Sequence, residues 1–339
     1  MMEFLSVLWF FLIFVLIAGY FVLDGFDLGI GVLSPFIAKN DEERAVLRRA
    51  IGPVWDGNEV WLLTAGGALF AAFPDAYATT FSGFYLAVML VLFGLIVRAV
   101  SFEFRAGDPS WGKLWDACFF VGSLLPALLL GVAVGNIFAG IPMDAAGDYA
   151  GLIGLITPFT LLTGLLGLAM FLAAGACWAA LKAPLPSYLQ ARAARLRLPL
   201  QVIALALFAV VSVYALVLVG PEMDPNLGIL RWLFVALVVV GLLASLVVGK
   251  TSGDDLKAFL AQSASMIALV ALLACSMFPV LVNATADSVG PAITLANAAS
   301  SELSLAWMTI ILCIGLPLVL VYHVVIYRTF RGRVNPADL

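Results

Sequence analysis

The stretch LDGFDLGIG, residues 23–31, ends the first long apolar run of the chain and carries two aspartates. A second apolar run opens with WDGNEVW, residues 55–61, which again carries two acids. Ionisable groups inside hydrophobic segments are rare, because they are costly to place in a membrane. The position of these four acids is therefore the main clue to fold and function.

Composition places the chain in a membrane. Hydrophobic residues make up 64% of it and charged residues only 11%, whereas a soluble domain has about 25% charged residues. A membrane-spanning helix needs about 20 apolar residues. We predict an all-α integral membrane protein with nine such helices, and one membrane domain over residues 1–339. The predicted spans are residues 7–33, 54–73, 79–101, 115–138, 156–181, 199–220, 229–249, 258–282 and 303–327.

Lysine and arginine gather on one side of the predicted spans. Sixteen of the 17 basic residues fall in or near alternate loops and in the C-terminal tail, and only Arg231 falls on the other side. Loops rich in basic residues stay in the cytoplasm. We therefore expect the N-terminus outside and the C-terminus in the cytoplasm. The outer loops carry Asp75, Asp144, Asp148, Glu222, Asp224 and Asp287.

In this orientation the first helix runs inward and the second begins at the cytoplasmic face. Asp24 and Asp27 are three residues apart and share a helical face, as do Asp56 and Glu59. All four acids then gather toward the cytoplasmic side, below the membrane surface.

Small and aromatic residues predict how these helices pack. Gly25 and Gly29 are spaced four apart, which would allow the first two helices to approach closely. Trp61 lies deep in the second span, so we expect it to pack between helices.

The acids point to proton transfer. Each costs about 2.5–3.5 kcal/mol on insertion, so four of them are unlikely to be accidental. A desolvated carboxyl group takes up and releases protons closer to neutral pH than an exposed one. We predict a proton path in which Asn58 helps to hold water. The candidate residues are Asp27, Asp56, Asp24, Glu59, Asn58 and, as an outlying member, Asp116 at the start of the fourth span.

Simpler explanations stay open for each acid. Asp56 and Glu59 follow a proline at a helix start, where acids stabilise the N-terminus. Asp24 and Asp27 lie near a helix C-terminus, which repels negative charge, so the alternatives there are an ion pair with Arg98 or a contact with another subunit. An acid that is held ionised by Arg98 would carry no proton.

Metal and haem ligation are not expected on this chain. Its four cysteines lie far apart, and the sequence contains no CxxC motif or Cys/His cluster of the kind that binds zinc. The single histidine, His323, is more often a packing residue than a ligand in such a position. Haems of the b type need His or Met as axial ligands, so one histidine cannot support a multi-haem chain.

The acids belong to a longer pattern. GYFVLDGFDLGIGVL, residues 19–33, is followed by IGPVWDGNEVWLLTAGGALFAAFPDAYATTFSGFYLAVMLVL, residues 51–92. Further matching stretches are WDACFFVGSLLPALLLGVAVGN (115–136), SMFPVLVNA (276–284) and LPLVLVYHVVIYRTFRGRV (316–334). Together they closely resemble the second subunit of bacterial cytochrome bd-type quinol oxidases, a family that includes the cyanide-insensitive oxidases.

The resemblance implies a nine-helix fold of two four-helix bundles and one peripheral helix, in the bacterial inner membrane. It also implies a tight heterodimer with a haem-bearing subunit 1, which carries haems b and d and the quinol site. The complex oxidises quinol and reduces dioxygen to water with cytoplasmic protons. In the family, the aspartates that match Asp27 and Asp56 are associated with a proton route. The resemblance further allows a bound ubiquinone and a small single-helix accessory subunit, with membrane lipids and quinol as other partners and no nucleic acid.

Two other functions fit the residues. A proton-coupled secondary transporter would use the acids as its coupling site, but such sites usually lie at broken helices near the membrane midplane, between inverted repeats. No internal repeat is visible in this sequence. A purely structural membrane subunit would use the acids only to hold helices together.

Overall fold

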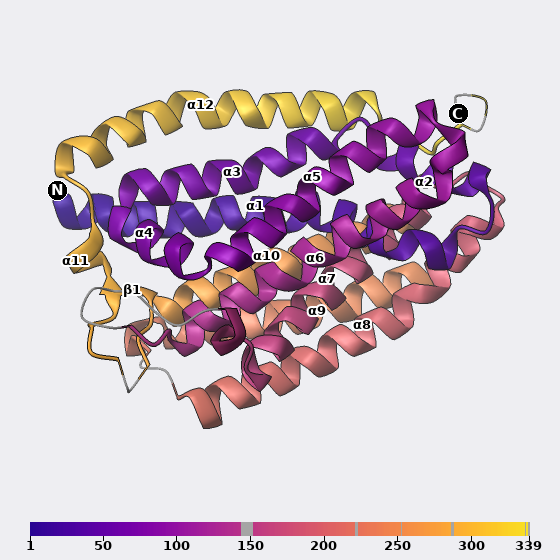
Figure 1. Ribbon diagram of the computed structural model, residues 1–339. Coiled ribbons are helices and arrows are strands. Elements are labelled where there is room, and N and C mark those ends of the chain that lie inside the picture. The colour runs from indigo at the N-terminus through magenta and orange to yellow at the C-terminus, as the bar shows by residue number, and fades with distance from the viewer. Residues whose placement is uncertain (144–151, 221–222, 252, 286–287, 336, 338–339) are drawn as a thin grey trace.

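The fold is a bundle of long helices that run side by side, seen in a computed structural model (Figure 1). The structure describes residues 1–143, 152–220, 223–251, 253–285, 288–335 and 337. Some residues covered by the predictions from sequence lie outside this part of the chain. They are residues 338–339 at the C-terminus and four acids assigned to outer loops: Asp144, Asp148, Glu222 and Asp287.

Helices account for most of the described residues. The α-helices are α1 (Met2–Ile37), α2 (Asp41–Ile51), α3 (Trp55–Ala72), α4 (Pro74–Gly83), α5 (Tyr85–Gly107), α6 (Gly112–Ala139), α7 (Pro158–Lys182), α8 (Tyr188–Tyr214), α9 (Gly228–Thr251), α10 (Asp255–Met277), α11 (Leu295–Ala298) and α12 (Glu302–Thr329). Short helical turns are η1 (Pro109–Trp111), η2 (Leu152–Leu155), η3 (Ala215–Val219) and η4 (Pro225–Leu227). Strands β1 (Val280–Val282) and β2 (Ile293–Thr294) pair antiparallel.

Eight helices in the described residues are long and apolar enough to cross a membrane, against nine predicted. The predicted span that is missing from these eight is the second, 54–73, which corresponds to α3, whose 18 residues include Asp56, Asn58 and Glu59 in the first two turns. This polar start lowers the apolar character of a short helix. The third predicted span, 79–101, was wrong in its bounds, since the chain forms α4 and α5 on either side of Phe84.

Long helices extend beyond their apolar runs. The sixth predicted span began at Pro199, yet α8 begins at Tyr188 and contains Pro199 in its interior. The turns before Pro199 bury Leu189, Ala193 and Arg197, while Arg195 is exposed. Helix α2 was not predicted as a separate element. Its N-terminus is capped by the side chain of Asn40, which accepts a hydrogen bond from the backbone N–H of Glu43.

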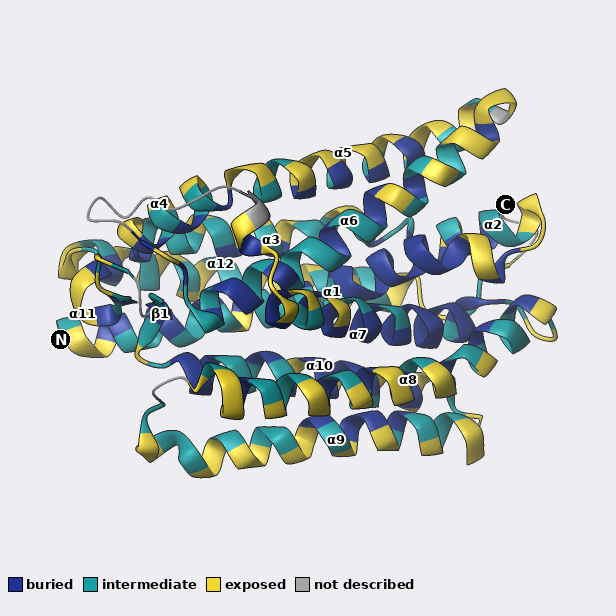
Figure 2. Ribbon diagram, turned by 60° about the horizontal axis from the view of Figure 1, so that its bottom comes forward, coloured by how far each residue is buried: buried dark blue, intermediate teal, exposed yellow. Residues whose placement is uncertain are grey.

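Helix α1 lies centrally and packs against α3, α6, α7 and α10. Helix α5 packs on α6, and α9 on α10. Helix α12 lies along the edge of the bundle beside α3 and α1 (Figure 1), and none of its most apolar segment is buried. Figure 2 shows buried residues concentrated in α1 and α7, and many exposed ones on α5, α8 and α9.

Glycines on α1 pack against a different helix from the one expected. A Cβ atom at Gly29 would collide with the backbone oxygen of Phe171, and one at Gly175 would lie 2.6 Å from the backbone carbon of Gly29. The close approach is therefore between α1 and α7, so the prediction that Gly25 and Gly29 bring α1 and α3 together was wrong. Helices α1 and α3 instead meet where Trp61 packs on Gly19.

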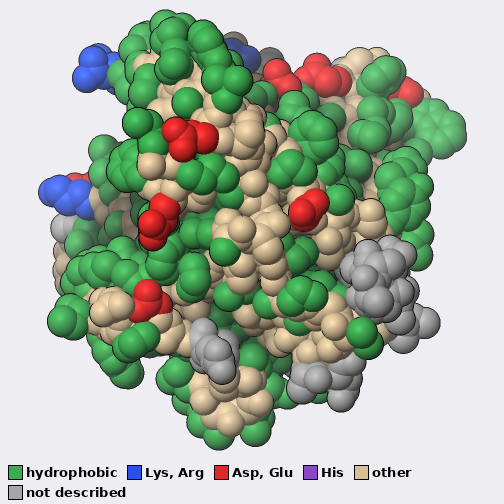
Figure 3. Space-filling model, turned by 90° about the vertical axis from the view of Figure 1, so that its left-hand side faces the viewer, with side chains coloured by type: hydrophobic (Ala, Val, Ile, Leu, Met, Phe, Trp, Pro, Cys, Tyr) green, Lys and Arg blue, Asp and Glu red, His purple; other side chains and the backbone are tan. Residues whose placement is uncertain are grey.

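Charge divides the two ends of the bundle. We call the end that holds α2, the α5–α6, α7–α8 and α9–α10 connections and the C-terminal tail the basic end (Figure 1). The opposite end holds the N-terminus, β1, β2 and α11. Figure 3 shows several acidic side chains and much hydrophobic surface across this opposite end, with basic side chains only at its rim.

Candidate functional site

A buried charge cluster joins α1, α3 and α5. Asp24 of α1 is fully buried, and Arg98 of α5 is only 2% exposed. Nη2 of Arg98 donates to Oδ1 of Asp24 at 2.7 Å and to Oε1 of Glu59 on α3 at 2.5 Å. One guanidinium therefore bridges two acids from different helices. Because Arg98 binds one acid on α1 and one on α3, it fixes how α1, α3 and α5 face one another.

Asp27 is the second fully buried acid of α1, one turn from Asp24. Its Oδ2 accepts a hydrogen bond of 2.7 Å from Nδ2 of Asn58, which also donates to the backbone oxygen of Leu23 at 3.0 Å. The hydroxyl of Tyr327 on α12 donates to Oδ1 of Asn58 at 3.1 Å. Asn58 thus connects α12 to the buried acid on α1. Asp27 makes no ion pair within the described residues.

The cluster has hydrogen-bonding capacity that the described residues do not use. The buried atoms Oδ1 of Asp27, Oδ2 of Asp24, Nη1 of Arg98 and the hydroxyl oxygen of Tyr20 have no hydrogen-bond partner there. Buried polar groups nearly always have partners, provided by protein or by water. Ordered water commonly provides the missing partners of such buried atoms.

The structure brings together four of the six predicted proton-path residues and the predicted ion-pair residue. Asp24, Asp27, Asn58, Glu59 and Arg98 form the cluster. Asn58 is fully buried, whereas the side chain of Glu59 keeps 23% of its surface exposed. Glu59 therefore lies at the edge of the cluster.

Asp56 and Asp116 lie outside this cluster. Asp56, in the first turn of α3, is exposed on the surface of the chain. Asp116 of α6 pairs with arginines at the basic end, at 3.0 Å from Nη1 of Arg48 and 3.1 Å from Nε of Arg105. Burial lowers the pKa of Arg48, and the charge of Asp116 opposes that effect. Asp116 thus holds α2 and the end of α5 to α6.

A second buried arginine was missed by the sequence reasoning. Arg197 of α8 is 4% exposed, and its Nη2 donates to Oδ1 of Asp255 at 2.6 Å. Nη2 of Arg333, in the C-terminal tail, donates to Oδ2 of the same acid at 2.7 Å. Nη1 of Arg333 also donates to the backbone oxygens of Ala180 and Ala183, each at 2.7 Å. The tail is thereby tied to the ends of α7, α8 and α10.

His323 on α12 is part of helix packing. Nε1 of Trp61 donates to Nε2 of His323 at 3.1 Å. Because Nε2 accepts, the proton of the neutral ring lies on Nδ1, which is 2.9 Å from the backbone oxygen of Val319 and donates to it. Trp61 packs between α1 and α12, as its depth in the span predicted.

Tyr20 and Tyr327 were also missed. Tyr20 lies four residues before Asp24 on the same face of α1, so this spacing could have suggested it. Tyr327 belongs to the last helix, and the sequence around it does not indicate which helix its side chain faces.

Comparison with known proteins gives a consistent result. Residues 5–330 match the family described as cytochrome bd terminal oxidase subunit II. The chain is 33% identical to the "Cytochrome bd-I ubiquinol oxidase subunit 2" of Escherichia coli, over 99% of this chain and 97% of that one. It is 36% identical to the "Cytochrome bd ubiquinol oxidase subunit 2" of Bacillus subtilis, over 97% of this chain and 96% of that one.

A further relative is the "Probable cytochrome oxidase subunit 2" of Haemophilus influenzae, which is 34% identical over 98% of this chain and 96% of the relative. A chain in the solved structure of the bd oxidase from Geobacillus thermodenitrificans has the same fold, with a TM-score of 0.79 at 17% identity over 96% of this chain and 98% of that chain. The match covers nearly the whole length in each comparison. The chain belongs to the family of cytochrome bd terminal oxidase subunit II.

Proposed function

We propose that this chain scaffolds the haem-bearing subunit 1 of a quinol oxidase and supplies a proton-uptake path from the cytoplasm to it. The names of the relatives, subunit 2 of ubiquinol oxidases, support a complex with a subunit 1. The buried cluster of three acids around one arginine supports the proton path. It is the observation that carries this proposal.

The proposed topology has nine spans, arranged as two four-helix bundles with α12 at the periphery. Helix α3 would cross the membrane in addition to the eight long apolar helices, its polar start being covered by other protein. The N-terminus would lie outside and the C-terminus in the cytoplasm, with the basic end inward. The charge difference between the two ends supports this orientation. A cytoplasmic reporter enzyme fused after Asp338 should be active, and activity of a periplasmic reporter there would reverse the orientation.

Charge balance within the cluster separates the roles of its acids. Arg98 compensates Asp24 and Glu59 directly. Asp27 receives only a neutral hydrogen bond from Asn58. A buried carboxyl group without a cation favours the protonated form. In this proposal Asp27 carries the proton, and Asp24 and Glu59 hold Arg98 in place.

Asp56 has a different role in the proposal. Its carboxylate lies on the exposed face of α3, where an acid at membrane depth is costly unless protein or water covers it. The partner subunit would cover this face. Asp56 would then be the neighbouring proton carrier on the route between Asp27 and the partner.

The contacts of His323 do not fit haem ligation. Both ring nitrogens of His323, the one histidine in the sequence, are used in hydrogen bonds to Trp61 and Val319. The described part of the chain holds no group of three or more His, Cys, Asp or Glu residues that could bind a metal ion. Haems b and d would be ligated by subunit 1, and no step of the reaction is assigned to a haem on this chain.

The test uses the purified oxidase complex with Asp27→Asn, a substitution that keeps shape but cannot carry a proton. A positioned proton carrier contributes about 10²-fold or more, so oxygen consumption and proton uptake should fall by about that factor. Haem content and assembly should stay near normal. Asp75→Asn, on an exposed acid in the first turn of α4 at the opposite end, is the matched control and should change nothing.

Asp56→Asn tests whether both acids lie on one path. It should slow turnover as Asp27→Asn does, and the double variant should be little worse than either single variant, since one route is blocked twice. Normal turnover in all three variants would refute the proton path. A purely structural role is the second candidate, because Arg98 bridges α1, α3 and α5. It predicts normal turnover for each complex that assembles.

A further inference from the structure

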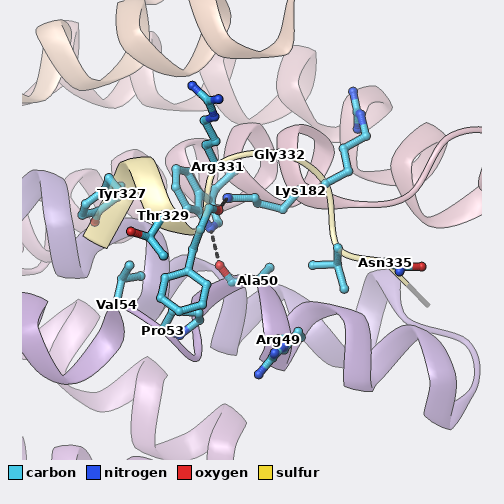
Figure 4. A pocket seen from close by; sticks show the side chains of 14 residues that line it. Arg49, Ala50, Pro53, Val54, Lys182, Tyr327, Thr329, Arg331, Gly332 and Asn335 are labelled. Carbon is cyan, nitrogen blue, oxygen red and sulfur yellow. Dashed lines mark hydrogen bonds between the residues drawn. The ribbon is translucent and has the colours of Figure 1, made fainter. Parts of the chain in front are cut away.

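A cavity of about 190 Å³ lies at the basic end, between the turn from α2 to α3, the end of α7 and the tail that follows α12 (Figure 4). Four of its lining residues are cationic: Arg49, Lys182, Arg331 and Arg333. None of the described residues that line it is an aspartate or glutamate. A concave site with four cations and no acid favours an anion.

Lys182 is the residue that points most clearly to a ligand. It is the last residue of α7 and is 8% exposed. Its Nζ donates to the backbone oxygen of Phe330 at 2.6 Å and lies 5.0 Å from the ring of Trp178. Within the described residues it makes no ion pair, so a buried ammonium has only partial negative charges near it. A buried charge without a counter-charge is costly, and a bound anion would remove this cost.

The other three cations differ in whether an acid neutralises their charge. Arg333 already pairs with Asp255. Arg49 and Arg331 are exposed and make no ion pair in the described chain. Figure 4 shows Lys182 in the middle of the view, with Arg49 and Arg331 on opposite sides of it. Arg49, Lys182 and Arg331 thus line the cavity without an ion pair among the described residues.

We propose that this cavity binds a phosphate group, and that the headgroup of an anionic phospholipid supplies it. Basic pockets between transmembrane helices at the cytoplasmic side bind such headgroups. The cavity wall includes Tyr327 and Trp178, residue types that favour the membrane interface. Helix α12, which ends at the cavity, is exposed and apolar along its length, so acyl chains could run along it.

This inference does not depend on the proton path. Among the described residues, Arg49, Lys182 and Arg331 form no hydrogen bond or ion pair with Asp27 or Asn58, and the proposed proton path uses none of the three. Because Lys182→Met would also remove the hydrogen bond to Phe330, the two exposed arginines are better test positions. Arg328 is a matched control, since it is an exposed arginine of the same terminal segment and does not line the cavity.

The experiment measures ligand retention on the purified, delipidated complex by native mass spectrometry. Three probes are added separately: phosphatidylglycerol, which is anionic, phosphatidylcholine, which has a phosphate but no net charge, and inorganic phosphate. Wild type should retain phosphatidylglycerol most strongly. Each removed charge near the membrane surface weakens such binding roughly fivefold.

Arg49→Gln and Arg331→Gln should each lower the affinity for phosphatidylglycerol roughly fivefold, and the double variant roughly 25-fold. Arg328→Gln should retain the lipid as wild type does. Equal retention by wild type and the double variant would overturn the phosphate site. Inorganic phosphate that binds, displaces phosphatidylglycerol and is lost in the double variant would support the phosphate site and overturn the lipid as its source.

Discussion

Two buried arginines, Arg98 and Arg197, each form ion pairs that join different helices. The groups around Arg98 carry an excess of negative charge, and those around Arg197 an excess of positive charge. Arg98 is surrounded by acids, since Asp24 and Glu59 bind it and Asp27 lies one turn from Asp24. Arg197 shares the single acid Asp255 with a second arginine, Arg333. The first cluster has more acids than cations, and the second has more cations than acids.

This difference separates chemistry from structural support. An excess of buried acids is relieved when one of them binds a proton, and this is the basis of the proton path that we propose for the Arg98 cluster. An arginine does not lose its proton in proteins, so the Arg197 cluster has no comparable way to change its charge. We expect the Arg98 cluster to affect turnover and the Arg197 cluster to affect only stability and assembly.

Replacement of the two buried arginines, one at a time, should give the largest effect on stability. It should also show directly that the two clusters differ. Arg98→Gln leaves Asp24 and Glu59 without a cation, which should cost about 3–5 kcal/mol and reduce the amount of assembled complex. Arg197→Gln leaves Asp255 paired with Arg333, so its cost should be smaller. Thermal unfolding of the complex in detergent measures both. Adding Asp24→Asn to Arg98→Gln should restore part of the loss, and equal losses for the two arginines would contradict the comparison.

Arg333→Gln should have the next largest effect. Hydrogen bonds to charged groups contribute about 1.5–3 kcal/mol, and Arg333 makes them to Asp255 and to the end of α7. The variant should unfold at a lower temperature and keep normal oxygen consumption for each assembled complex. Arg328→Gln, in the same terminal segment, is the control for a changed net charge. Slower turnover in Arg333→Gln at normal haem content would show that the Arg197 cluster has a role in chemistry.

Two buried side-chain amides, Asn58 and Gln201, lie at or near the two clusters. Only substitution of Asn58 should lower turnover, and the effect should be moderate. Asn58→Leu removes the hydrogen bond to Asp27 but leaves the carboxyl group in place. It should therefore cost part of the benefit of a positioned proton carrier, about tenfold in turnover. Gln201→Met, near the second cluster, removes a hydrogen bond of 2.6 Å to Ser245 and should leave turnover unchanged. A loss of turnover of equal size in both variants would show a general packing effect.

The smallest effect should come from an exposed ion pair at the basic end. A hydrogen bond from Arg44, and then the charge of Arg105, hold the pKa of Asp41 below its ordinary value. Since the folded pKa is the lower one, the contribution of Asp41 is present above the unfolded pKa and is lost as pH falls through the folded pKa. Asp41→Asn should make thermal stability less dependent on pH in acid. High salt should reduce the difference, because exposed charges are screened. A change of slope near neutral pH would assign the effect to another group.

The sequence predicted much of the first cluster because acids in apolar segments are distinctive. Asp24, Asp27, Asn58 and Glu59 lie together as the spacing on two neighbouring helices predicts. It did not separate Asp56 from Glu59, which are three residues apart. On α3, the boundary between the buried and the exposed face lies between these two acids, and Glu59 itself keeps 23% of its side chain exposed. The position of this boundary depends on how α3 is rotated against α1, and that rotation is set by side-chain packing.

The second cluster could not be predicted in the same way. Arg197 and Asp255 lie in loops by sequence, where charges are usually solvated, and their burial follows from α8 extending before Pro199. The partner Arg333 is far from both in the sequence. Gly29 was recognised as a packing residue, but its partner Gly175 could not be chosen, because a small residue does not indicate which helix it faces.

The position of Arg333 also has a consequence for the order in which the protein matures. The ends of α7 and α10 that it joins are made well before the tail is synthesised. Because a chain folds from its N-terminus during synthesis, those helices can be inserted while Arg333 is still absent. The contacts that Arg333 makes at the basic end therefore form after the helices that it joins. A chain cut short just after α12 should still insert its helices, yet remain open to proteases at that end.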